Sequence, residues 1–179
     1  MAAKRIVSER LTLRPTRPDD GPALVAILRE PEVALYWPDF DEARVRDELL
    51  TPDEEVTVFA IEHEGRVVGA VQYSENDDPQ YRHAGIDIFV GGAWRGRGLG
   101  AEAIRAVARH LFEERGHHRL VIDPAAANER AIRAYERVGF RRVGVMRQYE
   151  RAPDGSLRDG LLMDMLRDEL APPDRGALG

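Results

Sequence analysis

A short basic and glycine-rich stretch, residues 94–100, carries the residue types that hold a phosphate. Its sequence, Trp-Arg-Gly-Arg-Gly-Leu-Gly, lies between an apolar strand-like run at 85–90 and a helix-like run that starts near Gly98. The unpaired N–H groups of a helix N-terminus stabilise an anion, and glycine lets the backbone approach it closely. Arg95 and Arg97 add guanidinium donors for phosphate oxygens. The stretch predicts a phosphate-binding turn, although an ordinary basic turn explains these residues equally well.

Spacing excludes two other kinds of glycine-rich phosphate loop. A Walker loop needs Lys-Ser or Lys-Thr after its glycines, and neither follows here. A Rossmann fingerprint needs a further glycine where the chain continues Ala-Glu-Ala after Gly100, and it usually opens the first βαβ unit. About ninety residues precede this turn, so it does not open the first βαβ unit of the chain. The remaining pattern is Arg-x-x-Gly-x-Gly, from Arg95 to Gly100.

Composition restricts the class of protein. The 179 residues, 43% hydrophobic and 32% charged, predict one globular domain over 1–170 with a flexible tail at 171–179. No apolar run is long enough to span a membrane, and residues 1–5 lack a signal-peptide core, so a cytoplasmic location without membrane contact is expected. The net charge of −6 disfavours nucleic acid; it either attracts a cationic substrate or simply keeps the protein soluble. The absence of cysteine excludes an acyl-cysteine intermediate.

The elements around the glycine turn follow from hydrophobic periodicity and from cap and turn residues. We expect strands over 10–15, 56–61, 66–74, 84–90, 119–122, 140–147 and 161–166. We expect helices over about 20–30, 41–50, 98–115 and 128–138, and an irregular aromatic segment at 32–40. The order is therefore β, α, α, β, β, β, α, β, α, β, β.

This order, together with the glycine turn, resembles the GNAT acetyltransferase superfamily, whose Arg-x-x-Gly-x-Gly loop binds the pyrophosphate of acetyl-CoA. The segments 85–87, 122–124 and 128–140 look like those of the aminoglycoside 6′-N-acetyltransferases. The resemblance runs from about Tyr36 to Phe140. It implies an α/β fold, with a twisted mixed sheet of about seven strands and about four helices on both faces.

The resemblance also implies acetyl-CoA as co-substrate. We expect the N–H groups of 97–100 and the side chains of Arg95 and Arg97 to bind its pyrophosphate, and an N–H near 88–90 to polarise the thioester carbonyl. Asn128 resembles a CoA-contacting asparagine, but helix capping explains it equally well. The predicted cofactor set is Ile88, Phe89, Val90, Arg95, Gly96, Arg97, Gly98, Leu99, Gly100, Ala101, Asn128 and Tyr135. The five histidines show no metal-ligand spacing, so no metal is expected.

Three ionisable residues could carry proton transfer. Tyr135 is the candidate general acid, because a phenol has a pKa of about 10, near that of a leaving thiol; the alternative is a core aromatic. Asp87 and Asp123 belong to successive predicted strands and can meet at one end of a cleft. A carboxylate there accepts a proton from a substrate ammonium or holds that ammonium, and the family's matching acids contact the substrate. The alternatives are a structural carboxylate at Asp87 and a strand end at Asp123.

The acceptor side of the predicted site is the least determined. Tyr36 and Trp37 resemble the aromatic pair that lines the family's substrate cleft, although such residues often serve packing. The chain departs from the family in its short 75–83 segment and after Phe140. The predicted function is direct acetyl transfer, within a ternary complex, to a small cationic amine such as the 6′-amino group of an aminoglycoside. Acetylation of a protein N-terminus or lysine, and a non-catalytic CoA-binding regulatory module, remain alternatives; the oligomeric state stays open, with a homodimer among the options.

Overall fold

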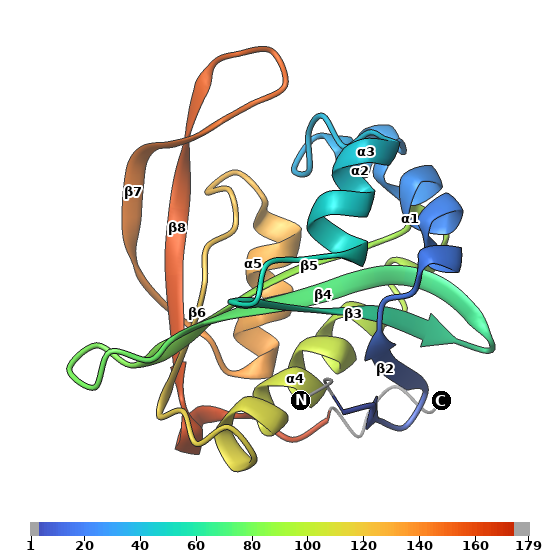
Figure 1. Cartoon of the computed structure of the whole chain (residues 1–179). Helices are drawn as coiled ribbons and strands as arrows, with labels where there is room; N and C mark the ends of the chain where they lie inside the picture. Colours follow the sequence, from blue (N-terminus) through green and yellow to red (C-terminus); the bar gives the residue numbers. More distant parts are fainter. Residues whose placement is uncertain (1–3, 174–179) are drawn as a thin grey trace.

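Residues 4–173, which the computed structural model describes, are organised around one mixed sheet (Figure 1). The order of its eight strands is β1-β2-β3-β4-β5-β6-β8-β7. Neighbouring strands are antiparallel except for β5 and β6, which are parallel. The strands are β1 (Ile6–Val7), β2 (Leu11–Pro15), β3 (Val56–His63), β4 (Arg66–Asn76), β5 (His83–Val90), β6 (Arg119–Ile122), β7 (Arg141–Arg151) and β8 (Leu157–Leu166).

Helices cover both faces of the sheet. One face carries α1 (Gly21–Leu28), α2 (Pro31–Ala34) and α3 (Glu42–Arg44), which continues as a π-helix over Val45–Leu50. The other face carries α4 (Leu99–Glu113) and α5 (Glu129–Val138). Short 3₁₀ turns lie at Pro18–Asp20, Gly92–Trp94 and Arg167–Glu169. None of the helices described between residues 4 and 173 combines the length and the apolar character that a membrane span requires.

Because side chains alternate between the two faces along each strand, the sheet has a separate hydrophobic core on each face. On β3, Phe59 packs with α4 and α5, whereas its neighbour Val58 packs with α1 and the π-helix. On β5, Ile86 belongs to the first core and Phe89 to the second. Because successive side chains of a strand point to opposite faces, Asp87 lies on the same face of β5 as Phe89. The fold therefore turns Asp87 toward the side that α1–α3 cover.

The predicted mixed α/β sheet with helices on both faces is confirmed, with local corrections. The additional strand β1 is only two residues long, too short to produce an alternating pattern. The segment 32–40, predicted to be irregular, begins with the helix α2, whose first residue is Pro31. Proline at the first helical position is a start signal that the aromatic character of the segment obscured. The strand predicted over 66–74 continues to Asn76.

The end of the described chain returns to the two helices of one face. The N–H of Ala171 donates to the carbonyl of Val138 at 2.8 Å, and Arg105 Nε donates to the carbonyl of Ala171 at 2.9 Å. The first residue of the predicted tail is thus hydrogen-bonded to α4 and α5. The remainder of that prediction, residues 174–179, lies outside the described residues.

Candidate active site

Strands β5 and β6 run together for only a short distance before they separate. Among the described residues, their pairs join 84–85 to 120–121, whereas β4 stays paired with β5 as far as Val90. The N–H of Gly91 donates to β4, and the amide direction alternates along a strand. The N–H groups of Ile88 and Val90 therefore point to the β6 side. The N–H of Phe89 points to β4 instead, so two of the three residues 88–90 have donors at the edge where the strands diverge, and their bond to a thioester carbonyl stays a prediction.

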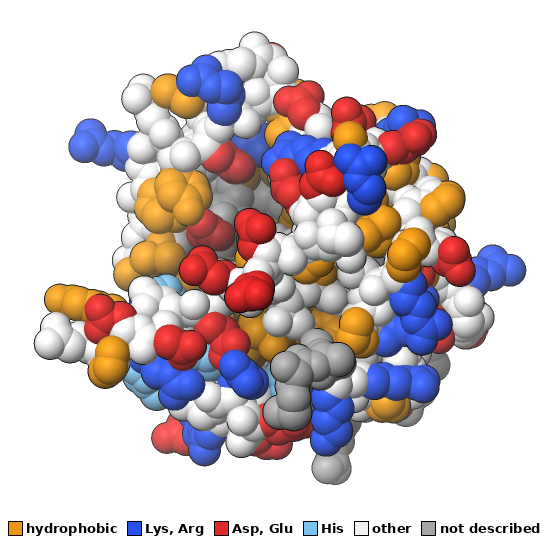
Figure 2. All heavy atoms as spheres, in the orientation of Figure 1, with side chains coloured by type: hydrophobic (Ala, Val, Ile, Leu, Met, Phe, Trp, Pro, Cys, Tyr) orange, Lys and Arg blue, Asp and Glu red, His pale blue; other side chains and the backbone are white. Residues whose placement is uncertain are grey.

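A cavity of about 610 Å³ lies where these strands diverge. Figure 2 shows a hollow between the β7–β8 side and the α2–α3 side, with acidic side chains around it. The predicted site residues that line the cavity are Tyr36, Trp37, Asp87, Ile88, Phe89, Val90, Arg95, Gly96, Gly98, Leu99, Gly100, Ala101, Asp123, Asn128 and Tyr135. Arg97 lies outside this lining, with its guanidinium 5.1 Å from the ring centroid of Trp94. The fold thus gathers all predicted site residues except Arg97 around one cavity.

The glycine turn leaves the N-terminus of α4 open to the cavity. Gly96 and Gly98 have φ values of 73° and 76°, and Gly98, the residue before the helix, makes no side-chain cap. A Cβ placed on Gly96 would meet nothing within 4 Å, and one on Gly100 would meet Val90 Cγ2 at 3.7 Å. Backbone donors without an internal partner therefore face open space, which is what a phosphate group requires. The geometry fits the predicted pyrophosphate site.

Arg95 reaches the cavity but is already paired. Its Nη1 lies 2.9 Å from Glu32 Oε2, and its Nε donates to the carbonyl of Val90 at 3.2 Å. A second carboxylate, Glu30, accepts a hydrogen bond of 2.6 Å from the N–H of Gly92. Two glutamates from the α1–α2 region thus contact the loop that would hold an anion. A phosphate at Arg95 would have to compete with Glu32.

Asn128 performs the capping role that the sequence allowed. Its side chain accepts a hydrogen bond of 3.2 Å from the N–H of Ala131, one turn into α5. The same residue lines the cavity. The cap is thus observed, and the contact with CoA stays a prediction.

Asp87, Asp123 and Tyr135 line one cavity and lie close enough to affect one another electrostatically. The Asp87 side chain is accessible from the cavity, and protein atoms surround it on its other sides. This burial and the charge of Asp123 raise the pKa of Asp87 to about 6, against a hydrogen bond from Gln72. Burial, and then the charges of Asp87 and Asp123, also raise the pKa of Tyr135. At neutral pH, Asp87 can accept a proton and the Tyr135 phenol can donate one.

The two aromatic residues predicted to contact the acceptor also take part in packing. The Trp37 ring lies edge-on to Phe89, with 4.9 Å between centroids, and 5.7 Å from Phe40. The guanidinium of Arg158, on β8, lies 5.1 Å from the ring centroid of Tyr36. Trp37 is thus both a core residue and part of the cavity wall. Packing and substrate contact are compatible here.

Tyr149 on β7 is a site residue that the sequence did not indicate. It lines the cavity, and its hydroxyl donates a hydrogen bond to Asp123 Oδ2. This bond, more than burial, raises the pKa of Tyr149 to about 12. The predicted strand 140–147 ended before it, and nothing in its neighbourhood relates it to Asp123. Only the tertiary arrangement brings the two together.

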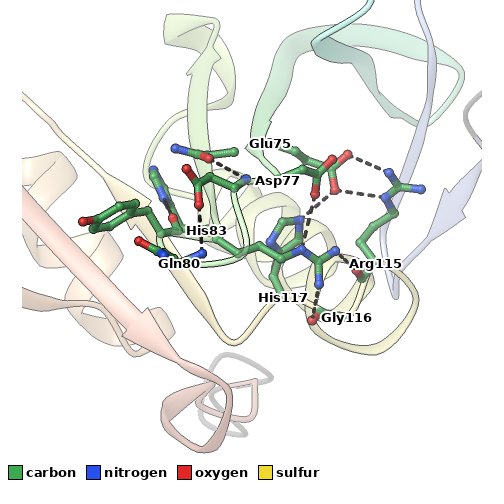
Figure 3. A network of polar contacts seen from close by, with 11 residues as sticks. Glu75, Asp77, Gln80, His83, Arg115, Gly116 and His117 are labelled. Atoms are coloured by element: carbon green, nitrogen blue, oxygen red, sulfur yellow. Dashed lines mark hydrogen bonds and ion pairs between the residues drawn. The ribbon is translucent and has the colours of Figure 1, made fainter.

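A second polar cluster lies at the far end of β4, among residues that do not line the cavity (Figure 3). Glu75 Oε2 lies 2.8 Å from Arg115 Nη2, and Glu75 Oε1 lies 2.7 Å from Nε2 of the buried His117. Arg82 donates to the carbonyls of Arg115 and Gly116. Burial alone would raise the pKa of Glu75, but the hydrogen bonds from Arg115 and His117 lower it. The cluster fixes the turn that leads from α4 into β6.

Residues 10–141 match the family model described as acetyltransferase (GNAT) domain. The chain therefore belongs to the GNAT acetyltransferase family, as its loop and order of elements predicted. It is an acetyl-CoA-dependent N-acetyltransferase.

The proteins that this chain resembles include enzymes named for small amine substrates. Aminoglycoside N(6′)-acetyltransferase type 1 of Klebsiella pneumoniae is 30% identical over 168 residues, covering 83% of this chain and 80% of that protein. The structure of AAC(6′)-Ib in complex with paromomycin and acetyl-CoA is 26% identical, has a TM-score of 0.74, and covers 90% of this chain and 96% of that chain. Spermidine N-acetyltransferase from Vibrio cholerae, solved with CoA and spermine, has a TM-score of 0.78 at 21% identity over 90% of this chain and 98% of its own; it shows the fold alone.

Proposed function

We propose that this enzyme transfers an acetyl group from acetyl-CoA to a primary amine of a small cationic acceptor, such as the 6′-amino group of an aminoglycoside. The observation that carries the proposal is the pair of carboxylates, Asp87 and Asp123, beside the Tyr135 phenol in one cavity. The similarity to aminoglycoside 6′-acetyltransferases supports the same acceptor class.

Charge at the cavity favours a cationic acceptor. Glu32, Glu48 and Glu150 each have an arginine partner within 2.9 Å, which offsets their charge. Among the residues that the structure describes, Asp87 and Asp123 are the acids that line the cavity without an ion pair; the cations that do so, Arg130 and Arg137, both belong to α5. Two carboxylates without a cation on an enclosed surface attract ammonium groups. An acceptor with a second ammonium near its reactive amine matches this arrangement.

The chain supplies a residue for each proton transfer. When bound, acetyl-CoA provides the activated acetyl group. The open N-terminus of α4 would hold its pyrophosphate, and the N–H groups of Ile88 and Val90 would hydrogen-bond its carbonyl. Asp87 accepts the proton of the substrate ammonium, Asp123 holds the acceptor, and Tyr135 protonates the departing sulfur. Transfer is direct, because the chain has no cysteine to carry the acetyl group.

Thiol release from acetyl-CoA, followed against a panel of amines, tests the proposal. We expect saturable turnover with aminoglycosides that carry a 6′-amino group and none with their 6′-hydroxy analogues. Turnover with peptides alone would show a protein acetyltransferase instead. Binding of CoA in a calorimeter, without turnover on aminoglycosides, polyamines or peptides, would indicate a regulatory module and overturn the proposal.

A further inference from the structure

Tyr149 lies in an irregular part of the β7–β8 hairpin. The register of β7 against β8 shifts between Met146 and Glu150. Three β7 residues, Tyr149 among them, consequently lie opposite the single β8 residue Asp159. Gln148 adopts a φ of 51°, and its N–H donates to Asp159 Oδ1 at 2.8 Å. Bulges of this kind change the direction of a side chain and are frequent beside active sites.

Gly160 leaves room for the Tyr149 ring. A Cβ placed on Gly160 would lie 2.6 Å from Tyr149 Cδ1 and 3.2 Å from its Cγ. Real Cβ atoms essentially never approach another heavy atom to 2.6 Å, so any larger residue at this position would displace the ring. The ring therefore lies directly against the β8 backbone, and this contact depends on glycine.

The segment that carries Asp123 is fixed to the same part of β8. Two backbone hydrogen bonds of 2.8 Å join residues 124–126 to residues 159–161, beside an antiparallel bridge between Ala125 and Gly160. Residues 159–161 thus contact the bulge that carries Tyr149 and also the chain that follows Asp123. The positions of the phenol and the carboxylate are set by a shared piece of backbone.

The Asp123 carboxylate has one side-chain hydrogen-bond donor among the described residues. That donor is the Tyr149 hydroxyl. The other ionisable groups that face this pair are Asp87 from β5, Tyr135 from α5 and Glu150 from β7. These groups are acids, so none of them compensates the charge on Asp123. A neutral donor holds this carboxylate in place without cancelling the charge that attracts the acceptor.

We infer that Tyr149 is a positioning residue for the acetylation reaction. Its hydroxyl orients the Asp123 carboxylate, so that Asp123 anchors an acceptor ammonium while Asp87 takes up the proton. The inference rests on the proposed function. It also assigns a purpose to the bulge and to Gly160, which together place the hydroxyl.

Kinetics of Tyr149→Phe test the inference on the best acceptor from the amine panel. We expect the KM for the acceptor to rise about tenfold, the effect of one lost hydrogen bond to a charged group, with the KM for acetyl-CoA unchanged. Tyr81→Phe is the matched control, since Tyr81 is exposed and does not line the cavity.

Gly160→Ala provides a second variant that keeps the hydroxyl and moves it. We expect the same rise in acceptor KM, and no further loss when Gly160→Ala is combined with Tyr149→Phe. Tyrosine Cζ resonances add a readout that is independent of turnover. The Tyr149 ionisation near pH 12 should move toward 10 in both Gly160→Ala and Asp123→Asn.

The possible failures are distinguishable. Normal turnover with no difference between Tyr149→Phe and Tyr81→Phe would overturn the inference alone. The inference also fails if Tyr149→Phe raises the KM for acetyl-CoA as much as the KM for the acceptor, which indicates a general structural role, or if Asp123→Asn leaves the Tyr149 ionisation unchanged. A wild-type enzyme that acetylates no amine overturns the proposed function and this inference together.

Discussion

The two ends of the cavity are built in opposite ways. The proposed cofactor end is one continuous stretch, 88–101, in which a strand, a glycine turn and a helix present backbone N–H groups. The proposed acceptor end is assembled from side chains of five separate elements: the α2 region, β5, the end of β6, α5 and β7. Backbone groups at the first end need only local geometry, whereas the second end depends on the register of distant strands. A cofactor site of the first kind can stay constant while an acceptor site of the second kind changes.

The largest predicted effect falls where the two ends meet. Tyr135→Phe removes the proposed proton donor and leaves the glycine turn intact, so kcat should fall by about 100-fold or more while acetyl-CoA binding changes little. Steady-state kinetics and calorimetry with CoA separate these two quantities. An unchanged kcat would remove Tyr135 from the mechanism.

Gly98→Val tests the claim that the cofactor end depends on backbone geometry alone. A β-branched residue at a φ of 76° carries strain of about 1–3 kcal/mol and should displace the turn, weakening CoA binding by roughly tenfold to a hundredfold. Gly65→Val is the matched control, because Gly65 has the same φ in the β3–β4 hairpin and does not line the cavity. Equal losses of CoA affinity in both variants would show general destabilisation instead.

The pH profile tests the acceptor end. The pKa of about 6 at Asp87 predicts that kcat/KM falls as pH drops below 6, because a protonated carboxyl cannot accept the substrate proton. Asp123→Asn removes a negative charge that raises the pKa of Asp87, so the acid limb should move to lower pH. Asp53→Asn, an exposed acid of the loop before β3, should leave the profile unchanged. An acid limb that ignores Asp123 would contradict the proposed coupling.

The smallest predicted effect concerns the ion pair between Glu32, in the α2 region, and Arg95, in the glycine turn. Glu32→Gln removes the carboxylate that pairs with Arg95, which frees the guanidinium for phosphate. An exposed ion pair of this kind contributes at most about 1 kcal/mol, so acetyl-CoA should bind up to about fivefold more tightly. Glu42→Gln, an equal charge change at an exposed pair with Arg29, serves as control. Weaker binding in Glu32→Gln would mean that Glu32 orients Arg95 for the ligand.

The same contrast explains what the sequence could reveal. The cap at Asn128 follows from a few adjacent residues, and the structure confirms this local feature. The pairing of Glu32 with Arg95, and the bond from Tyr149 to Asp123, join positions far apart in the chain. Such contacts depend on strand register and on one bulge, which hydrophobic periodicity does not encode. The acceptor end was therefore predicted only as far as the family resemblance reached.

The short junction between β5 and β6 has a consequence for motion and assembly. Two residue pairs connect the part of the sheet formed by β1–β5 to the part formed by β6–β8. This seam is parallel and joins segments distant in the chain, so it should be among the last regions to form during folding and among the first to exchange its amide hydrogens. A cofactor lodged along the seam would tie both parts together and slow that exchange. Transient opening of this seam would then limit the rate at which the CoA product dissociates.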